Sequence, residues 1–208
     1  MLSYRRRRRG LSLLLLTTSM LLAARLATAA TDPGSRGPAS PEPWPFETGR
    51  VEVGLLLGGG PTLQHGSRDA NVIAVLPRVG YVVHEFLSGV PGSVEVLAQP
   101  SYLAVFEDGA IHVGGLAALA KYNFRTGTSV TPYVEAGAGV TYASRDVPSK
   151  GSQFNFSLQA GVGVQYALSG RATVNLAWLY HHLSNADIYS RNVGLNTGLF
   201  LLGFSWFY

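Results

Sequence analysis

The stretch QFNFSLQAGVGVQYAL, residues 153–168, decides the fold because two kinds of side chain alternate along it without a break. Its even positions are all apolar, from Phe154 to Leu168, and its odd positions are polar or small, from Gln153 to Ala167. Side chains of a β-strand point alternately to opposite faces, so this pattern predicts a strand with one apolar face. A usual globular strand has roughly five or six residues. A tilted strand that crosses a bilayer needs about nine to eleven, which this stretch exceeds.

The same alternation continues through the chain from residue 49 onward. Clusters of Gly, Ser, Asp and Asn separate the alternating segments, as is typical of turns. Three segments alternate less cleanly, the first, the second and the fourth, so their registers stay open. The eight segments expected are 49–59, 71–86, 93–106, 110–124, 131–143, 153–168, 171–184 and 196–208.

Eight long strands of this kind predict an all-β fold, an eight-stranded antiparallel transmembrane β-barrel of the outer-membrane type. A closed barrel leaves no strand edge unpaired, which lipid could not satisfy. The competing fold is a soluble eight-stranded barrel such as a lipocalin, whose apolar face would point inward. Polar Gln153, Asn155, Gln159 and Gln165 opposite an apolar face on so long a strand favour the membrane barrel.

The first 48 residues differ in composition from the barrel region. A basic cluster (Arg5 to Arg9), an apolar stretch and a small-residue end at Ala29-Ala30 predict a secretory signal peptide over residues 1–30. Residues 31–48 carry five prolines and predict an extended linker or N-terminal tail. The barrel is then expected over residues 49–208.

Charge and cysteine content exclude some classes of function. The signal peptide removes six arginines and no acids, which leaves ten basic residues against twelve acidic ones. The pI of about 9.5 therefore belongs to the precursor, and no nucleic-acid partner is expected. The chain has no cysteine, and its histidines show no ligand spacing, so neither a disulfide, a metal nor a cofactor is expected.

The connections and the end of the chain indicate a location. Short connections are expected after the second, fourth and sixth segments, and longer ones after the first, fifth and seventh. Outer-membrane barrels have short periplasmic turns and longer external loops. The chain also ends on aromatic residues, Trp206 to Tyr208. We expect the outer membrane of a Gram-negative bacterium, with the loop 185–195 outside and membrane lipid around the barrel.

One polar group interrupts the lipid-facing side of the seventh segment. Alternation places Trp178, Tyr180, His182 and Ser184 on one face, and Asn196 begins the same face of the eighth segment. Antiparallel pairing is expected to set Ser184 near Asn196 and His182 near Gly198.

These residues suit acyl transfer to water. A serine hydroxyl needs an adjacent base, and a histidine, with an ordinary pKa of about 6.5, suits that task. An amide such as that of Asn196 can orient the ring through its other nitrogen. Asn185 and Ala186, which follow the serine, are candidates for binding the substrate and its developing oxyanion. The alternative is that the polar groups lie in the headgroup zone without a catalytic role.

Glu52, Arg78, Glu95 and Glu135 form a second polar group. We expect them to face inward and to fill the barrel with a charged network rather than to catalyse a reaction.

Three stretches together resemble the lipid A 3-O-deacylase (PagL-like acyloxyacyl hydrolase) family. The first is His182-Leu183-Ser184-Asn185-Ala186, followed by Asn192-Val193-Gly194-Leu195-Asn196. The others are residues 132–140 and Phe154-Asn155-Phe156 leading into residues 159–164. The resemblance covers about residues 50–208.

The resemblance implies an outer-membrane barrel that hydrolyses the ester at the 3 position of lipid A in lipopolysaccharide and releases a 3-hydroxy fatty acid. The histidine and serine of the family correspond to His182 and Ser184. In the best-known members an acidic residue completes the triad, and its position corresponds to Asn196, so this chain departs from the pattern there. Asp187 is the nearest other carboxylate in the sequence. The alternatives left open are a non-catalytic barrel of the same shape, with a structural or adhesive role, and a related acyltransferase or phospholipase in the same membrane. Whether the protein forms a homodimer is also left open.

Overall fold

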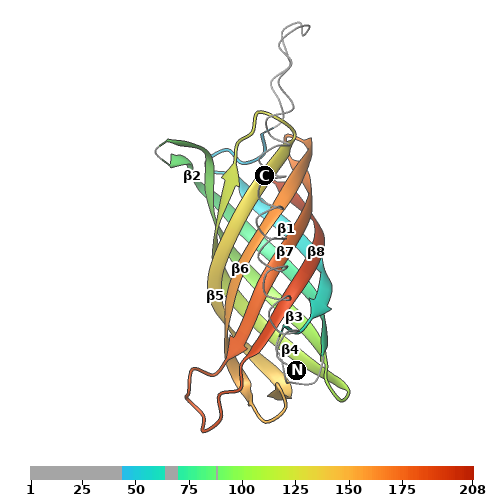
Figure 1. The fold of residues 1–208 in the computed structure, drawn as a ribbon. Helices are drawn as coiled ribbons and strands as arrows, with labels where there is room; N and C mark the ends of the chain where they lie inside the picture. Colours follow the sequence, from blue (N-terminus) through green and yellow to red (C-terminus); the bar gives the residue numbers. More distant parts are fainter. Residues whose placement is uncertain (1–43, 64–69, 88) are drawn as a thin grey trace, which may run out of the picture. The chain divides into compact units, whose positions relative to one another are not determined.

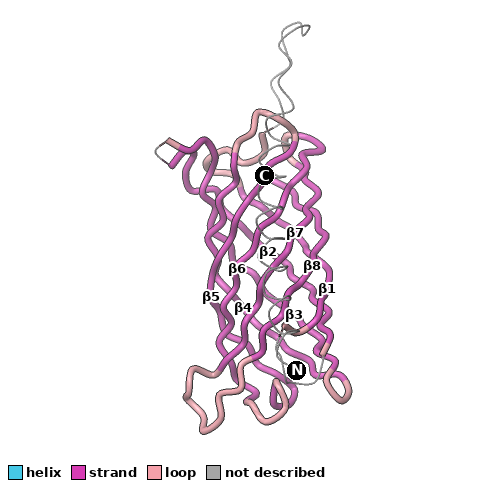
Figure 2. The backbone as a smooth tube through the Cα atoms, viewed as in Figure 1, coloured by secondary structure: helices cyan, strands magenta, loops and turns pink. Residues whose placement is uncertain are grey.

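The alternating segments form eight antiparallel strands, and each strand pairs with its neighbours in sequence (Figures 1 and 2). β8 also pairs with β1, which closes the sheet into a barrel and confirms the expected fold. The structure is a computed structural model that describes residues 44–63, 70–87 and 89–208. The expected signal peptide, residues 1–30, and the linker up to residue 43 lie outside the described residues.

The strands are long enough to cross a bilayer, since the shortest has 11 residues. Their bounds are β1 (Val51–Pro61), β2 (Asn71–Leu87), β3 (Val90–Phe106), β4 (Ala110–Phe124), β5 (Val130–Val147), β6 (Ser152–Ser169), β7 (Ala172–Ser184) and β8 (Leu195–Phe207). None of the described residues belongs to an apolar helix of membrane-spanning length.

β5 differs most from its expected bounds. It extends to Val147, so that only residues 148–151 connect it to β6, and the longer connection expected there is wrong. The polar residues Ser144, Arg145 and Asp146 suggested a loop, but here the strand continues with an irregular register between Tyr142 and Val147. Beyond the part of the barrel that lies in lipid, water surrounds both faces of a strand. Alternation is therefore no longer required, and the sequence signal ends before the strand does.

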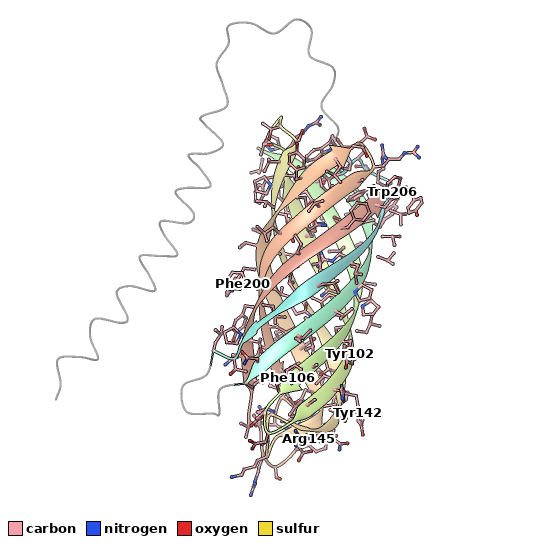
Figure 3. The ribbon with its side chains drawn as sticks, turned by 90° about the vertical axis from the view of Figure 1, so that its right-hand side faces the viewer. Tyr102, Phe106, Tyr142, Arg145, Phe200 and Trp206 are labelled. Atoms are coloured by element: carbon pink, nitrogen blue, oxygen red, sulfur yellow. The ribbon has the colours of Figure 1, made fainter. Side chains whose placement is uncertain are left out.

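The outer surface of the barrel is apolar. Outward side chains include Leu158, Leu176 and Phe200, which are among the most exposed apolar residues of the barrel. Aromatic side chains point outward near both ends: Trp206 near one end and Tyr142 near the other (Figure 3). Such girdles are typical of barrels that cross a membrane.

Charged and amide side chains fill the interior of the barrel. Lys121 Nζ lies 2.9 Å from Glu52 Oε2 and 3.0 Å from Glu95 Oε2. Arg78 forms a second ion pair, with Nη1 3.1 Å from Glu135 Oε2. All five side chains are buried, which confirms the expected inward network. Lys121 was missed because the segment 110–124 alternates poorly.

The two ends of the barrel differ. At one end Phe46 is buried and packs edge-on against Phe207, with ring centroids 5.1 Å apart. The described end of the expected linker thus contacts the barrel. The C-terminus lies at this end, and the β7–β8 connection lies at the opposite end (Figure 1). The candidate residues at the end of β7 are therefore far from the chain terminus, as expected.

Candidate active site

The outer face of β7 carries four partly exposed side chains toward its end: Trp178, Tyr180, His182 and Ser184. The residues between them point inward, and His181 and Leu183 are each 1% exposed. Alternation along the strand thus separates two neighbouring histidines, one in the interior and one on the outer wall. His182 and Ser184 lie on the outer wall, as the sequence predicts.

The pairing of β7 with β8 differs from the expected register by two residues. His182 lies directly opposite Asn196, and Tyr180 lies opposite Gly198. The expected pairs, Ser184 with Asn196 and His182 with Gly198, are wrong. A slip by one residue would turn every side chain to the other face, whereas a slip by two keeps each on its own face. The alternation of the sequence therefore could not reveal the difference.

This register brings His182 and Asn196 into direct contact. His182 Nδ1 and Asn196 Oδ1 are 2.6 Å apart, which is a short hydrogen bond. The Tyr180 hydroxyl donates a second hydrogen bond to the same oxygen, also of 2.6 Å. Because an amide oxygen can only accept, Nδ1 of the ring carries the proton in this arrangement. Nε2 is then the nitrogen with a lone pair available for a substrate or a hydroxyl.

The space around the imidazole is narrow. A Cβ atom at Gly194 would lie 3.0 Å from His182 Cε1, so glycine at this position leaves room for the ring. On the other side of β7, the residue opposite His182 is Leu158 of β6. The ring thus lies between an apolar neighbour on one side and a hydrogen-bonding neighbour on the other.

The start of β8 is also held by the two residues that follow β1. The Leu63 N–H donates to the Asn196 carbonyl over 2.8 Å, and Thr62 bridges to Thr197. A Cβ atom at Gly198 would lie 3.2 Å from Trp178 Nε1 and 3.4 Å from a Leu63 methyl carbon. Trp178 of β7 and Leu63, which follows β1, therefore cover this glycine.

Ser184 lies one position beyond the last β7–β8 pair. Its partner on β6 is Phe156, whose ring packs edge-on against Phe154 with centroids 5.4 Å apart. Positions i and i+2 of a strand lie roughly 7 Å apart on the same face, so Ser184 and His182 are neighbours on the wall. No hydrogen bond joins them in the part of the chain described. Catalytic hydrogen bonds are often long before the substrate binds.

Asn185 does not offer the free donor that the sequence reasoning expected. Its side chain is buried, and its amide nitrogen donates to Ser152 Oγ (3.0 Å) and to the Arg191 carbonyl (2.8 Å). Its backbone N–H donates to Asn192 Oδ1. These bonds tie the β7–β8 connection to β6 and to itself. Asn185 points inward because it continues the alternation one residue after Ser184.

Ala186 follows Asn185 and carries the second backbone N–H after the serine. Its φ of +51° and the φ of +62° at Asp187 are left-handed, which is uncommon for residues other than glycine. No described residue accepts a hydrogen bond from the Ala186 N–H. Of the two oxyanion candidates, Ala186 is thus the one with an available donor.

Asp187 does not replace the missing acid. It is exposed, and its backbone N–H donates to Asn185 Oδ1. No hydrogen bond or ion pair between its carboxylate and His182 occurs among the described residues. Asn196 is therefore the group that contacts Nδ1 of the ring.

Sequence reasoning missed three contributors to this site. Tyr180 stands on the same face as His182 in the alternation, but the two-residue register error hid its contact with Asn196. Leu63 and Asn192 lie in connections, where no periodicity indicates which residues approach the site. Only the folded arrangement could identify these two.

The fold and the site together define a membrane-type β-barrel with a histidine, a serine and an oriented amide on its outer wall. A family model described as lipid A 3-O-deacylase (PagL) matches residues 84–205, more than half of the chain. The chain belongs to this family, which confirms the resemblance found in the sequence. The matched range includes His182, Ser184 and Asn196.

Solved structures share the fold. The crystal structure of the outer membrane enzyme PagL superposes with a TM-score of 0.59 at 20% sequence identity, covering 73% of this chain and 97% of that one. Neisserial surface protein A (NspA) gives a TM-score of 0.53 at 16% identity, with coverages of 76% and 95%. These similarities agree with the outer-membrane location expected from the sequence. Comparison with curated proteins gave no significant match.

Proposed function

We propose that this protein is an outer-membrane esterase that hydrolyses the 3-O-linked acyl ester of lipid A. Ser184 is the nucleophile, His182 the general base and Asn196 the residue that orients the base. The observation that carries the proposal is the 2.6 Å hydrogen bond between His182 Nδ1 and Asn196 Oδ1. This hydrogen bond fixes the orientation of the imidazole on the same outer wall that carries Ser184. The chain belongs to the lipid A 3-O-deacylase family.

The proposed reaction has two acyl-transfer steps. Ser184 Oγ attacks the ester carbonyl carbon while His182 Nε2 takes the hydroxyl proton. The Ala186 N–H stabilises the negative charge that develops on the carbonyl oxygen. The ring then gives its proton to the departing sugar oxygen, which leaves an acyl-serine. Water, activated by the same nitrogen, releases the 3-hydroxy fatty acid and restores Ser184.

The position of the residues suits a lipid substrate. Ser184 and His182 are partly exposed on the outer wall, beside Phe156 and Leu158 of β6. An acyl chain already in the membrane can lie along these apolar side chains while its ester reaches Ser184. The end of β7 is opposite the chain terminus, which supports a site in the outer leaflet, where lipopolysaccharide lies.

The second candidate is a non-catalytic barrel of the same architecture. Two points favour it: Asn196 stands where the family resemblance implies an acid, and among the described residues no hydrogen bond joins Ser184 to His182. Loss of the acid in a serine triad lowers the rate by about 10⁴-fold. The two candidates differ in whether lipid A changes when the protein is present.

Mass spectrometry of lipid A from Gram-negative cells that express the full chain tests the proposal. The expected result is a lipid A species lighter by one 3-hydroxyacyl chain, together with the free 3-hydroxy fatty acid. Ser184→Ala and His182→Gln should each abolish both products. Ser169→Ala is the matched control, because this serine is exposed at the other end of the barrel and should leave both products in place.

The outcome separates the candidates cleanly when the amount of folded protein in the membrane is measured alongside. Unchanged lipid A in cells with folded wild-type protein would support the non-catalytic barrel. A product that persists in the Ser184→Ala variant would contradict the assigned nucleophile.

A further inference from the structure

Asn196 Oδ1 is the meeting point of two donors from the same strand. The Tyr180 hydroxyl and His182 Nδ1 each lie 2.6 Å from it. Both donors belong to the outer face of β7, and the acceptor lies opposite His182 on β8. The tyrosine therefore contacts the group that orients the histidine rather than the histidine itself.

An amide needs orienting in a way that a carboxylate does not. A carboxylate presents two equivalent acceptor oxygens, whereas an amide presents one acceptor oxygen and one donor nitrogen. If the Asn196 nitrogen faced the ring, His182 Nδ1 would have to accept, and the ring proton would move to Nε2. The ring could then not take a proton from Ser184.

The Tyr180 hydroxyl favours the productive orientation. With Oδ1 toward the ring, both the phenol O–H and the Nδ1–H have an acceptor. With the amide reversed, the phenol oxygen could accept from the Asn196 nitrogen, but the phenol proton would lose its acceptor. The difference between the two orientations is thus the phenol proton of Tyr180, which has an acceptor only when Oδ1 faces the tyrosine and the ring.

We propose that Tyr180 is a positioning residue that holds the Asn196 amide with its oxygen toward His182 and thereby keeps the ring proton on Nδ1. It compensates for the acid that this chain lacks, by fixing the direction of the hydrogen bond. Its effect on hydrolysis rests on the proposed function. Its effect on the position of the ring proton does not, because that proton is placed whether or not a substrate is cleaved.

The first test measures the ring proton directly. In purified full-length protein with ¹⁵N-labelled histidine, the His182 signal, identified by its loss in His182→Gln, should show protonated Nδ1 and unprotonated Nε2. Tyr180→Phe removes only the hydroxyl and should shift the population toward protonated Nε2. Tyr166→Phe, an exposed tyrosine on the outer face of β6, is the matched control and should leave the signal unchanged. An unchanged signal in folded Tyr180→Phe would overturn the proposal.

The second test compares two backgrounds. Tyr180→Phe should lower kcat on lipid A by about threefold to tenfold, the effect of one net hydrogen bond, with little change in KM. In the Asn196→Asp background the acceptor is symmetric, so the same change should lower kcat by less than about twofold. Equal losses in both backgrounds would show that the hydroxyl acts by some route other than orienting the amide. A wild-type protein without activity would refute the proposed function, and the NMR experiment would still decide the role of Tyr180.

Discussion

Asn196 is the residue at which this chain departs from the serine, histidine and acid that the family resemblance implies. Asn196 keeps the hydrogen bond that orients His182, at 2.6 Å, but it brings no negative charge. In the proposed mechanism the amide can therefore select the useful tautomer, while it cannot stabilise by charge the imidazolium that would form when Ser184 loses its proton. Under the proposed function, the consequence is slower hydrolysis with the same geometry.

Asn196→Asp is accordingly expected to raise kcat, by at least about tenfold and at most about 10⁴-fold, because a carboxylate at this position stabilises the charged ring. Asn196→Leu, of similar size but without an acceptor, should lower it. Both values come from rates of fatty acid release by purified protein on lipid A in detergent. A folded aspartate variant that is no faster than the parent would contradict the role given to Asn196.

Residue types and their faces could be read from the sequence, but distances between strands could not. Alternation placed His182 and Ser184 on the outer wall, because each face of a strand repeats every second residue. The contact between His182 and Asn196 depends on a register that alternation leaves undetermined by two residues. The inward direction of Asn185 also follows from alternation, although its partner Ser152 lies on another strand.

The β7–β8 connection is an element with an internal structure of its own. Asn185 anchors it to Ser152 and to the Arg191 carbonyl, and Asn192 accepts from the Asn185 backbone. The two left-handed residues, Ala186 and Asp187, follow immediately. This hydrogen bonding holds the backbone beyond Ser184 in a definite path, which sets where the Ala186 N–H lies.

Asn185→Ala tests whether this residue is an anchor or an oxyanion donor. As an anchor, its loss leaves buried groups without partners, at about 1–3 kcal/mol, and should make the connection more susceptible to proteolysis. Ser152→Ala removes one of the same bonds from the β6 side and should produce the same change to a smaller degree. A variant with reduced kcat but a connection as protected as in the parent would instead support a direct oxyanion role.

The sequence predicted the presence and the number of the strands better than it predicted the residues at which they end. The eight segments were recognised because lipid requires one apolar face throughout the belt. The extension of β5 to Val147 was not, because strand residues beyond the belt follow no such rule. The interior position of Lys121 was not predicted either, because small residues such as Ala117 and Ala118 occur on both faces of β4 and weaken the alternation.

At the scale of the whole molecule, buried ion pairs in the interior connect strands of the barrel to one another. Lys121 bridges Glu52 and Glu95, and Arg78 pairs with Glu135, all in the buried interior. Removing one partner of a buried ion pair leaves the other charge uncompensated, which costs about 3–5 kcal/mol. These charges thus make the strands that carry them depend on one another.

Lys121→Met should therefore lower the free energy of unfolding by about 3–5 kcal/mol, measured as a lower denaturant midpoint for the protein in lipid vesicles. Lys150→Met, at an exposed position in the β5–β6 connection, is the control and should have little effect. Adding Glu52→Gln and Glu95→Gln to the Lys121 variant should restore much of the loss. An unchanged midpoint for Lys121→Met would mean that the bridge is dispensable.

The hydrogen bond from Leu63 to the Asn196 carbonyl crosses the seam where the two ends of the sheet meet. β1 and β8 lie at opposite ends of the chain's strand order, so they become neighbours only when the sheet closes. Asn196 has its full set of contacts, from β7 on one side and from Leu63 after β1 on the other, only in that closed state. A chain whose sheet has not yet closed would thus lack the contact from Leu63, so the complete surroundings of Asn196 form only together with the barrel.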